Sequence, residues 1–499
     1  MSTRKLITLV AAATLWASLS CTYPSGSVVA APQPRPAVAP GPKDGPLLVY
    51  TTAENGDRVP DYSYAGYMAG EKPIPTVPAK LLVGDANADD NTRTIQAAID
   101  QCGKLPVGAD GFRGAVLIPP GEYKIAGSIV LNVSGVVLRG SGVGERGTTL
   151  LATGFDRRTV IQVRGKPRTV STTQPIADQY VPVNAQQVKI KDSAGIATGD
   201  SVVITLPSTP AWIAALGMDD LGGDRHGPSW RPGSRDVVFD RVVTKIDGST
   251  LTLDAPLTIA LDAKFGGATI AKADTSGLVR NVGVENLRVV SAFDAKNPKD
   301  EEHAWFGVGI NDARDVWVRQ VTFVHLAGSA VAAWESSSRV TVEDCKSLDP
   351  VGEIGGWRRN TFFTNGQQVL MQRLYSEAGV HDFAVGFAAP GPNAFVQCEA
   401  MNSNGESGPI DSAACGTLYD RVRIDGGALS LRNRTYQGQG VGWASFNGTL
   451  YNSTAPLIEC HAPPRAELGV WHQWRIQRQR RVLRLERRRQ SRQPVLRAA

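Results

Sequence analysis

Two adjacent pairs of residues in the second half of the chain carry side chains that move protons or bind anions. His381 stands next to Asp382 in the stretch GVHDFAVGF. Histidine changes its charge near neutral pH, so His381 is a candidate base or acid, with Asp382 as its catalytic partner. Arg358 and Arg359 stand together in GGWRRNTFF. Adjacent residues of a strand face opposite sides, so at least one of these arginines is expected at the surface.

Arginine suits the recognition of acidic sugars, because its guanidinium group binds a carboxylate through two parallel hydrogen bonds. We expect Arg358 or Arg359 to act as base or to neutralise the carboxylate of a uronic acid. Arg432 and Arg434, in LSLRNR, are expected to hold further carboxylates of the substrate. The alternative for Arg358 and Arg359 is an ordinary surface ion pair with a nearby acid, namely Asp349, Glu353 or Glu377.

Further candidates for substrate binding are a histidine and several tryptophans. His325 lies in the apolar stretch FVHLAGSAV, and its alternative is a buried ring bonded to a carbonyl. Tryptophan can stack on sugar rings, although each could equally belong to the core. The tryptophans considered are Trp230, Trp305, Trp357 and Trp443, of which Trp230 and Trp305 are the preferred binding residues.

Paired carboxyl groups offer a second chemistry, since a glycosidase needs two of them beside the scissile bond. The candidate acids are Glu335, Asp344, Glu353, Asp382, Glu406 and Asp411, and they form no close paired motif. We therefore prefer β-elimination on an acidic polysaccharide, in which a base removes a ring proton and the glycosidic oxygen leaves. Hydrolysis, with Asp382 and one of Glu335, Glu353, Glu406 or Asp411, remains the alternative. A non-catalytic glycan-binding protein is the third hypothesis.

A repeated strand pattern must position these residues. Alternating apolar residues return in phrases such as NVGVENLRV, DVWVRQVTF, RVTVEDCKS and QVLMQRLYS, between about residues 278 and 455. The first anchors of the phrases are Val284, Val318, Val342, Met371, Phe395, Tyr419 and Leu450, at intervals of 34, 24, 29, 24, 24 and 31 residues. Period two inside a phrase indicates a strand, and the recurring interval indicates stacked coils. The sequence predicts a parallel β-helix, with the ionisable residues along one flank.

The N-terminal part of the repeat region supplies a resemblance. Residues 85–103 predict a short helix that begins at Asp90 or Asn91 and ends at Gly103, and residues 114–153 predict short strands. IQAAID in that helix, followed by VLIPPGEYKI and VVLRGSG, resembles the first coils of right-handed β-helix proteins of the pectate-lyase superfamily. The resemblance implies an all-β, right-handed parallel β-helix and a polysaccharide lyase or glycoside hydrolase. Related proteins often bind Ca²⁺, but no cluster of aspartates here requires it.

The chain is predicted to divide into four parts. Residues 1–31 have the charged start, apolar run and small-residue cleavage site of an export signal, and residues 32–46 form a proline-rich linker. Residues 47–464 form the β-helix, which an inserted β-subdomain interrupts at residues 178–262. Its loop at 212–236 is expected to be a lid or wall beside the site. Lipid attachment at Cys21 is an alternative to release, so we predict a secreted or cell-envelope protein of a bacterium.

The arginine-rich tail, residues 465–499, explains the basic charge of the chain. The net charge is +6, and eleven arginines and two acids give the tail +9, so residues 1–464 carry −3. A mildly acidic body does not favour nucleic acid as a partner, and we expect a monomer that binds a polysaccharide. Because the repeat stops abruptly at residues 461–464, we favour a shifted reading frame for the tail over a basic arm or a solvated helix.

Overall fold

The computed structural model describes residues 38–40, 48–87, 89–222, 229–356 and 358–461, and the backbone of three short strands beyond them. The predicted export signal, Cys21, most of the linker and Trp357 lie outside the described residues. Within the described part of the chain, no helix combines the length and apolarity needed to cross a membrane.

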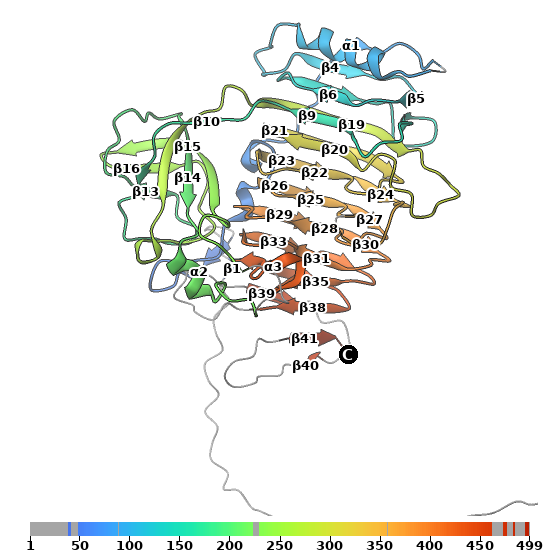
Figure 1. Ribbon diagram of the computed structural model, residues 1–499. Coiled ribbons are helices and arrows are strands. Elements are labelled where there is room, and N and C mark those ends of the chain that lie inside the picture. The colour runs from blue at the N-terminus through green and yellow to red at the C-terminus, as the bar shows by residue number, and fades with distance from the viewer. Residues whose placement is uncertain are drawn as a thin grey trace, which may run out of the picture. The chain divides into compact units, whose positions relative to one another are not determined.

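Parallel strands stack into three sheets around one core and form a right-handed β-helix (Figure 1). The first sheet contains β3 (Ala79–Leu82), β4 (Gly114–Leu117), β7 (Val136–Arg139), β19 (Val279–Ser291), β21 (Ala313–Val324), β23 (Ser337–Glu343), β26 (Gln367–Gln372), β29 (Asn393–Val396), β33 (Thr417–Asp420) and β37 (Thr449–Ser453). The second contains β5 (Gly121–Ile125), β8 (Thr148–Ala152), the second halves of β19 and β21, β24 (Lys346–Leu348), β27 (Tyr375–Glu377), β30 (Glu399–Met401) and β34 (Arg423–Ile424).

The third sheet contains β6 (Ile129–Leu131), β9 (Thr159–Arg164), β20 (Phe306–Asn311), β22 (Val331–Ala333), β25 (Phe362–Thr364), β28 (Phe383–Val385), β31 (Glu406–Pro409), β35 (Ala428–Leu431) and β38 (Leu457–Cys460). Each turn of the chain passes through the first, second and third sheets in that order. Smaller elements are β1 (Val38–Pro40), β2 (Leu48–Tyr50), β32 (Ala414–Cys415), β36 (Ser445–Phe446) and α3 (Gln437–Gly440).

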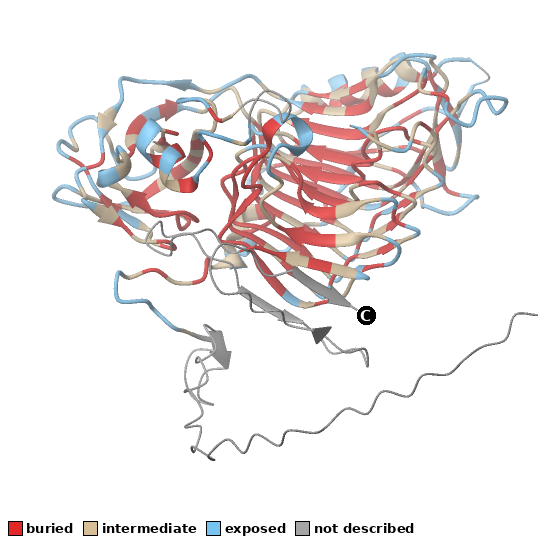
Figure 2. Ribbon diagram, turned by 60° about the horizontal axis from the view of Figure 1, so that its bottom comes forward, coloured by how far each residue is buried: buried red, intermediate tan, exposed pale blue. Residues whose placement is uncertain are grey.

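In the first sheet the anchors of the predicted phrases stack on one another. The seven anchors lie in one register column, from Val284 beside Val318 to Tyr419 beside Leu450. All seven are buried in the same core, and the rings of Phe395 and Tyr419 stack with their centroids 5.0 Å apart. Burying such a side chain contributes roughly 1.5–3 kcal/mol, so the column stabilises every coil contact. In Figure 2 the strands of the coils are mostly coloured as buried.

The helix α1 (Thr92–Gly103) covers the first coils, as its pattern predicts. Ile95, Ile99 and Cys102 are buried against the core beneath it. The Asp90 carboxylate accepts a hydrogen bond from the Thr92 backbone N–H at 2.9 Å, which satisfies one free donor at the start of the helix. The apolar end of the solenoid is thereby shielded from water.

An antiparallel β-subdomain is inserted between β9 and β19. Its strands are β10 (Thr169–Val170), β11 (Gln174–Pro175), β13 (Gln187–Lys189), β14 (Ser201–Leu206), β15 (Val237–Asp247), β16 (Thr250–Leu253) and β18 (Thr269–Asp274), with β12 (Tyr180–Val181) paired to β17 (Leu261–Asp262). Helix α2 (Pro210–Leu216) and the turn η3 (Ala263–Phe265) complete it. The buried Arg241 side chain joins the insert to the coils, since it donates to the Gln367 side chain at 2.7 Å and the Gly391 carbonyl at 3.3 Å.

A segment of the N-terminal region, which we call the strap (residues 62–78), crosses the outer face of the first sheet. It includes the turns η1 (Tyr62–Tyr64) and η2 (Tyr67–Gly70). The Tyr67 backbone N–H donates to Thr341 Oγ1 at 2.8 Å, and its ring lies edge-on to Trp317 at 5.3 Å. The Tyr62 hydroxyl group donates to the Asn447 carbonyl at 3.1 Å. The strap therefore covers the first sheet along several coils.

Beyond residue 461 only three strands of the tail are described. The strand β39 (Gln473–Ile476) pairs in parallel with β37, and β41 (Val495–Ala498) pairs antiparallel with β38 and β40 (Leu483–Arg484). The rest of the tail lies outside the described residues, so the shifted frame stays a hypothesis.

Candidate functional site

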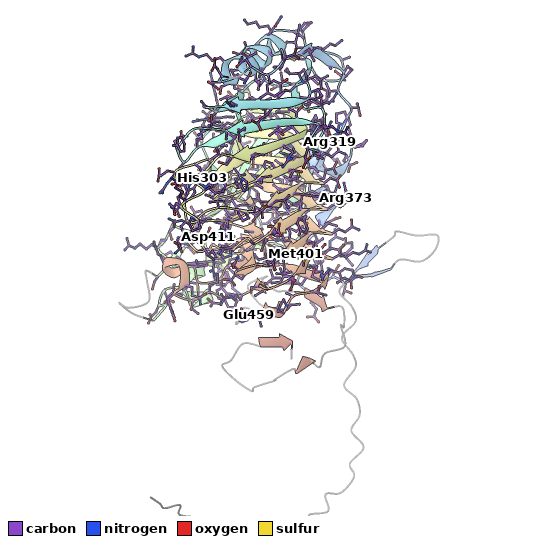
Figure 3. All side chains as sticks on the ribbon, turned by 90° about the vertical axis from the view of Figure 1, so that its right-hand side faces the viewer. His303, Arg319, Arg373, Met401, Asp411 and Glu459 are labelled. Carbon is purple, nitrogen blue, oxygen red and sulfur yellow. The ribbon has the colours of Figure 1, made fainter. Side chains whose placement is uncertain are left out.

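The outer face of the third sheet is lined by small residues and bordered by aromatic rings. Gln162, Gly309, Ala332, Phe363, Ala384, Gly408, Ser430 and Glu459 follow one another in a register column. Ala332, Phe363 and Ala384 belong to a small apolar cluster that is separate from the main core, because they point outward. In Figure 3 His303, Asp411 and Glu459 lie along one side, opposite Arg319 and Arg373.

Four aromatic side chains form what we call the aromatic strip: Trp305, Phe306, Trp334 and Phe363. Neighbouring rings lie 6.5, 5.8 and 5.6 Å apart between centroids, and the last two pairs meet edge to face. Trp305, Phe306 and Trp334 are half-buried, so part of each ring faces solvent. Aromatic faces of this kind suit the stacking of sugar rings.

Beyond the strip, toward the C-terminal coils, Glu406 gathers two arginines. Its carboxylate accepts hydrogen bonds from Arg432 Nε at 2.8 Å and Arg432 Nη2 at 2.9 Å, and it forms an ion pair with Arg434 Nη2 at 2.9 Å. Arg432 also lies 3.3 Å from Glu459. Burial alone raises the pKa of Glu406, but the hydrogen bonds from Arg432 and the charges of Arg434 and Arg432 outweigh it and hold the pKa below its usual range. Glu406 is therefore ionised at neutral pH.

His381 stands at the edge of this arginine–carboxylate group. Its Nδ1 lies 2.5 Å from the Glu406 carbonyl oxygen, so Nδ1 carries the proton and donates a hydrogen bond to that carbonyl. Burial lowers the pKa of His381, and the nearby Arg434 charge acts in the same direction. The ring is neutral at pH 7, which leaves a lone pair on Nε2. No described residue forms a hydrogen bond to Nε2.

The pKa of the Asp411 carboxyl group is shifted in the opposite direction from that of Glu406. Burial raises the pKa of this half-buried carboxyl group, although the charges of Arg434 and Arg235 oppose the shift. Its side chain makes no hydrogen bond to the described residues. Arg235 comes from the insert, and its guanidinium group lies 4.8 Å from the ring centroid of Phe387. The insert thus places the Arg235 charge beside Asp411, while the lid or wall expected from the 212–236 loop stays a prediction.

Arg358 and Trp305 lie together, but Arg358 is already paired. Its Nε and Nη2 atoms donate to Glu301 at 2.5 and 2.8 Å, and its guanidinium group lies 5.6 Å from the Trp305 ring centroid. Arg157 lies 5.2 Å from the same ring. The arrangement is the surface ion pair of the alternative hypothesis, with Glu301 as partner in place of the three acids we considered.

Four of the predicted site residues make hydrogen bonds or packing contacts within the fold. Asp382 is fully buried and accepts hydrogen bonds from the hydroxyl groups of Ser376 and Ser403, each at 2.5 Å. Arg359 is 8% exposed and donates to the carbonyls of Ala378 and Gly352. Trp230 is buried and donates to the Val441 carbonyl at 3.1 Å, and the His325 ring packs edge-on against Phe293 at 4.8 Å. None of these four side chains belongs to the aromatic strip or the Glu406 group.

The structure therefore brings together His381, Arg432 and Arg434 from the predicted set. Trp334, Phe363, Phe387 and Arg235 were not predicted as site residues. One signal could have found three of them, since the residue eight positions before an anchor is Trp334, Phe363, Phe387 and Asp411 in successive coils. Arg235 has no such signal because it belongs to the insert.

Binding of Ca²⁺ needs a group of side chains that could hold the ion. Among the described residues, no group of three or more His, Cys, Asp or Glu side chains could hold a metal ion. We therefore assign no role to the Ca²⁺ that the resemblance admits.

Fold and site together define a right-handed parallel β-helix with an ionisable, aromatic outer face. No family model and no curated protein matches the chain. Among solved structures, it is similar to the tailspike protein gp49 of Pseudomonas phage LKA1, at 15% identity and a TM-score of 0.41, over 73% of this chain and 52% of that one.

Two further solved structures are similar over comparable lengths. The surface adhesin PfbA of Streptococcus pneumoniae shares 13% identity, with a TM-score of 0.36, over 75% of this chain and 67% of that one. An iota-carrageenase from A. fortis shares 10% identity, with a TM-score of 0.32, over 77% and 60%. The chain thus spans about half to two thirds of the length of these proteins.

Proposed function

We propose that the protein binds a polysaccharide along the outer face of the third sheet and cleaves it by hydrolysis. The observation that carries the proposal is that Arg434 contacts both carboxyl-bearing segments: it forms an ion pair with Glu406 at 2.9 Å and donates to the carbonyl of Ile410, the residue before Asp411. The pKa of Asp411 is raised by burial, whereas the arginines hold the pKa of Glu406 low. Environments that separate two carboxyl pKa values are how glycosidases divide the roles of acid and base. An extracellular location, as the predicted export signal implies, accompanies this function.

The aromatic strip supports a polymeric ligand. Parallel strands lie about 4.8 Å apart, so the four steps from β20 to β31 span about 19 Å. That length accommodates several sugar units. The strip provides stacking surfaces at one end of the span, and Asp411 stands at the other. The first sheet is less suitable, because the strap covers it.

In the proposed reaction, protonated Asp411 donates its proton to the glycosidic oxygen as the bond to the anomeric carbon breaks. Water attacks the anomeric carbon, and its proton passes to the Glu406 carboxylate, which acts as the base. Glu406 accepts two hydrogen bonds, both from Arg432, and a carboxylate has about four acceptor positions, so Oε2 can still orient that water. The negative charge of Glu406 also stabilises the developing positive charge of the sugar ring.

Elimination on a uronate polymer is the second candidate, and the neutral His381 favours it. Its Nε2 lone pair could remove a ring proton, as proposed from the sequence. Against this, Arg358, Arg432 and Arg434 already bind carboxylates of the protein, so they are not free to neutralise the substrate carboxylate. For that reason the geometry favours hydrolysis.

The experiment is to incubate the purified protein with polygalacturonate, alginate, iota-carrageenan, laminarin and mannan. New reducing ends and the ultraviolet absorbance of an unsaturated uronate are followed together. Hydrolysis predicts reducing ends without absorbance, and Asp411→Asn should lower the rate about 10²–10⁴-fold. The matched control is Asp425→Asn, at an exposed aspartate on the second sheet's side. Absorbance that depends on His381 would replace hydrolysis with elimination, and binding without cleavage would favour the glycan-binding hypothesis.

A further inference from the structure

A polar pocket continues the outer face of the third sheet toward the N-terminal coils. Its volume is about 300 Å³, and it is lined by Thr159, Gln162, Arg164, Gly309, Asn311 and Asp312. These residues come from β9, from β20 and from the position that follows β20. The pocket is therefore on the same face as the aromatic strip and Asp411, at the opposite end from Asp411.

Three polar side chains of this pocket are free of partners in the part of the chain that the structure describes. Among the described residues, the side chains of Gln162, Arg164 and Asn311 have no hydrogen-bond or ion-pair partner. Arg164 is exposed, and Gln162 and Asn311 are half-buried. Together with the Asp312 carboxylate, they offer both donors and acceptors at close range. Sugar hydroxyl groups, which donate and accept at once, match such a set.

Gly309 opens the pocket onto the aromatic strip. A Cβ atom at this position would lie 3.2 Å from Thr159 Cγ2 and 3.7 Å from Trp334 Nε1. The missing side chain leaves the floor between β9 and Trp334 open. The edge of the Trp334 indole thus stands next to the pocket, and its face continues into the aromatic strip.

We propose that this pocket is a distal subsite for one sugar unit of the polysaccharide, which then lies parallel to the axis of the β-helix. The inference rests on the proposed function and extends it. From β9 to β31 the third sheet makes five strand steps, about 24 Å, so the pocket and Asp411 are separated by several sugar units. Long oligosaccharides reach both places, whereas short ones reach only one.

The test compares variants that fill the pocket with variants that remove its hydrogen-bonding side chains. Gly309→Val places a branched side chain between Thr159 and Trp334, and the double variant Arg164→Ala, Gln162→Ala removes donors without adding bulk. Gly84→Val is the matched glycine control, because a Cβ at Gly84 meets nothing within 4 Å. Arg423→Ala is the arginine control on the second sheet, where the side chain is 59% exposed.

The readout is the length dependence of binding and cleavage, measured on size-fractionated oligosaccharides from the polymer that the protein cleaves. The double variant should raise KM for long chains about ten-fold or more, leave kcat unchanged, and leave short chains unaffected; Gly309→Val should do the same. Equal effects on all lengths, or none on long chains, would overturn the subsite.

Affinity electrophoresis in gels that contain each polymer of the panel separates the subsite from the cleavage. If nothing is cleaved but the wild type is retarded more strongly than both pocket variants, hydrolysis fails and the subsite stands. If cleavage occurs and the pocket variants behave as wild type, hydrolysis stands and the subsite fails. No retardation of the wild type by any polymer would overturn both.

Discussion

Replacing Glu406 by glutamine should destabilise the C-terminal coils as well as impair the site. The amide oxygen can keep one of the two hydrogen bonds from Arg432, but the amide NH₂ group then faces the other guanidinium donor. Losing one charge-assisted hydrogen bond costs about 1.5–3 kcal/mol. The change also removes the countercharge of Arg432 and Arg434, which Glu459 only partly replaces at 3.3 Å from Arg432.

The expected cost follows from the exposure of the three side chains. Removing one partner of a fully buried pair costs about 3–5 kcal/mol. Glu406, Arg432 and Arg434 are 12%, 17% and 13% exposed, so water screens part of the loss. We therefore expect the free energy of unfolding to fall by about 2–4 kcal/mol, above the exposed-pair range and near the lower end of the buried-pair range.

The measurement is urea unfolding of the wild type and of Glu406→Gln at pH 7.5, with the slope m compared as well as the midpoint. The matched control is Glu399→Gln, because Glu399 and Arg423 form an exposed pair at 2.8 Å with side chains 42% and 59% exposed. That control should cost less than about 1 kcal/mol. Equal midpoints for the two variants would refute the view that Glu406 organises the two arginines.

Three further changes test other parts of the structure. Asp382→Asn should retain the wild-type rate of cleavage in the reducing-end assay, because the carboxyl group is bonded to two serines inside the coils; a loss as large as that of Asp411→Asn would return Asp382 to the site. Burial, together with the Arg432 charge, lowers the pKa of His461 to about 4. The unfolded chain therefore binds more protons between about pH 6.5 and 4, stability should fall as the pH falls through that window, and His461→Gln should flatten the dependence of the urea midpoint on pH. Arg241→Met should lower the free energy of unfolding by about 3–5 kcal/mol, since it leaves buried acceptors without a donor. The insert should then become open to limited proteolysis. Proteolytic fragments identical to those of the wild type would contradict the anchoring role.

The coils were predictable because their signal is local and repeated. Each coil needs an inward apolar residue at a similar sequence interval from the one in the preceding coil, so Val342 and Tyr419 could be placed from spacing alone. Cys345 and Cys398, two residues beyond their strands, are also buried. The resemblance to right-handed β-helix proteins adds the handedness, while the pectate-lyase superfamily itself stays a hypothesis.

The site was less predictable, because period-two counting fails at the corners between sheets. Arg359 has a positive φ of 57°, which turns the chain just before β25 and carries this side chain inward while Arg358 stays outside. Asp382 and Phe383 both point to the interior at the next corner, although they are neighbours. Partners far apart in the sequence, such as Arg358 with Glu301 and Asp411 with Arg235, follow from coil lengths and from the insert rather than from any local motif.

The strap has a consequence for the order of events during folding. It is among the first described segments to be synthesised, yet Tyr62 bonds to Asn447 and Thr449, 385 and 387 residues later. Contacts over such sequence separations form late, because the entropy of closing the loop must be overcome first. The strap must therefore wait beside an unfinished first sheet until the last coils are made. In a chain that stops short of those coils Tyr62 would have no partner, and the strap would be open to proteolysis.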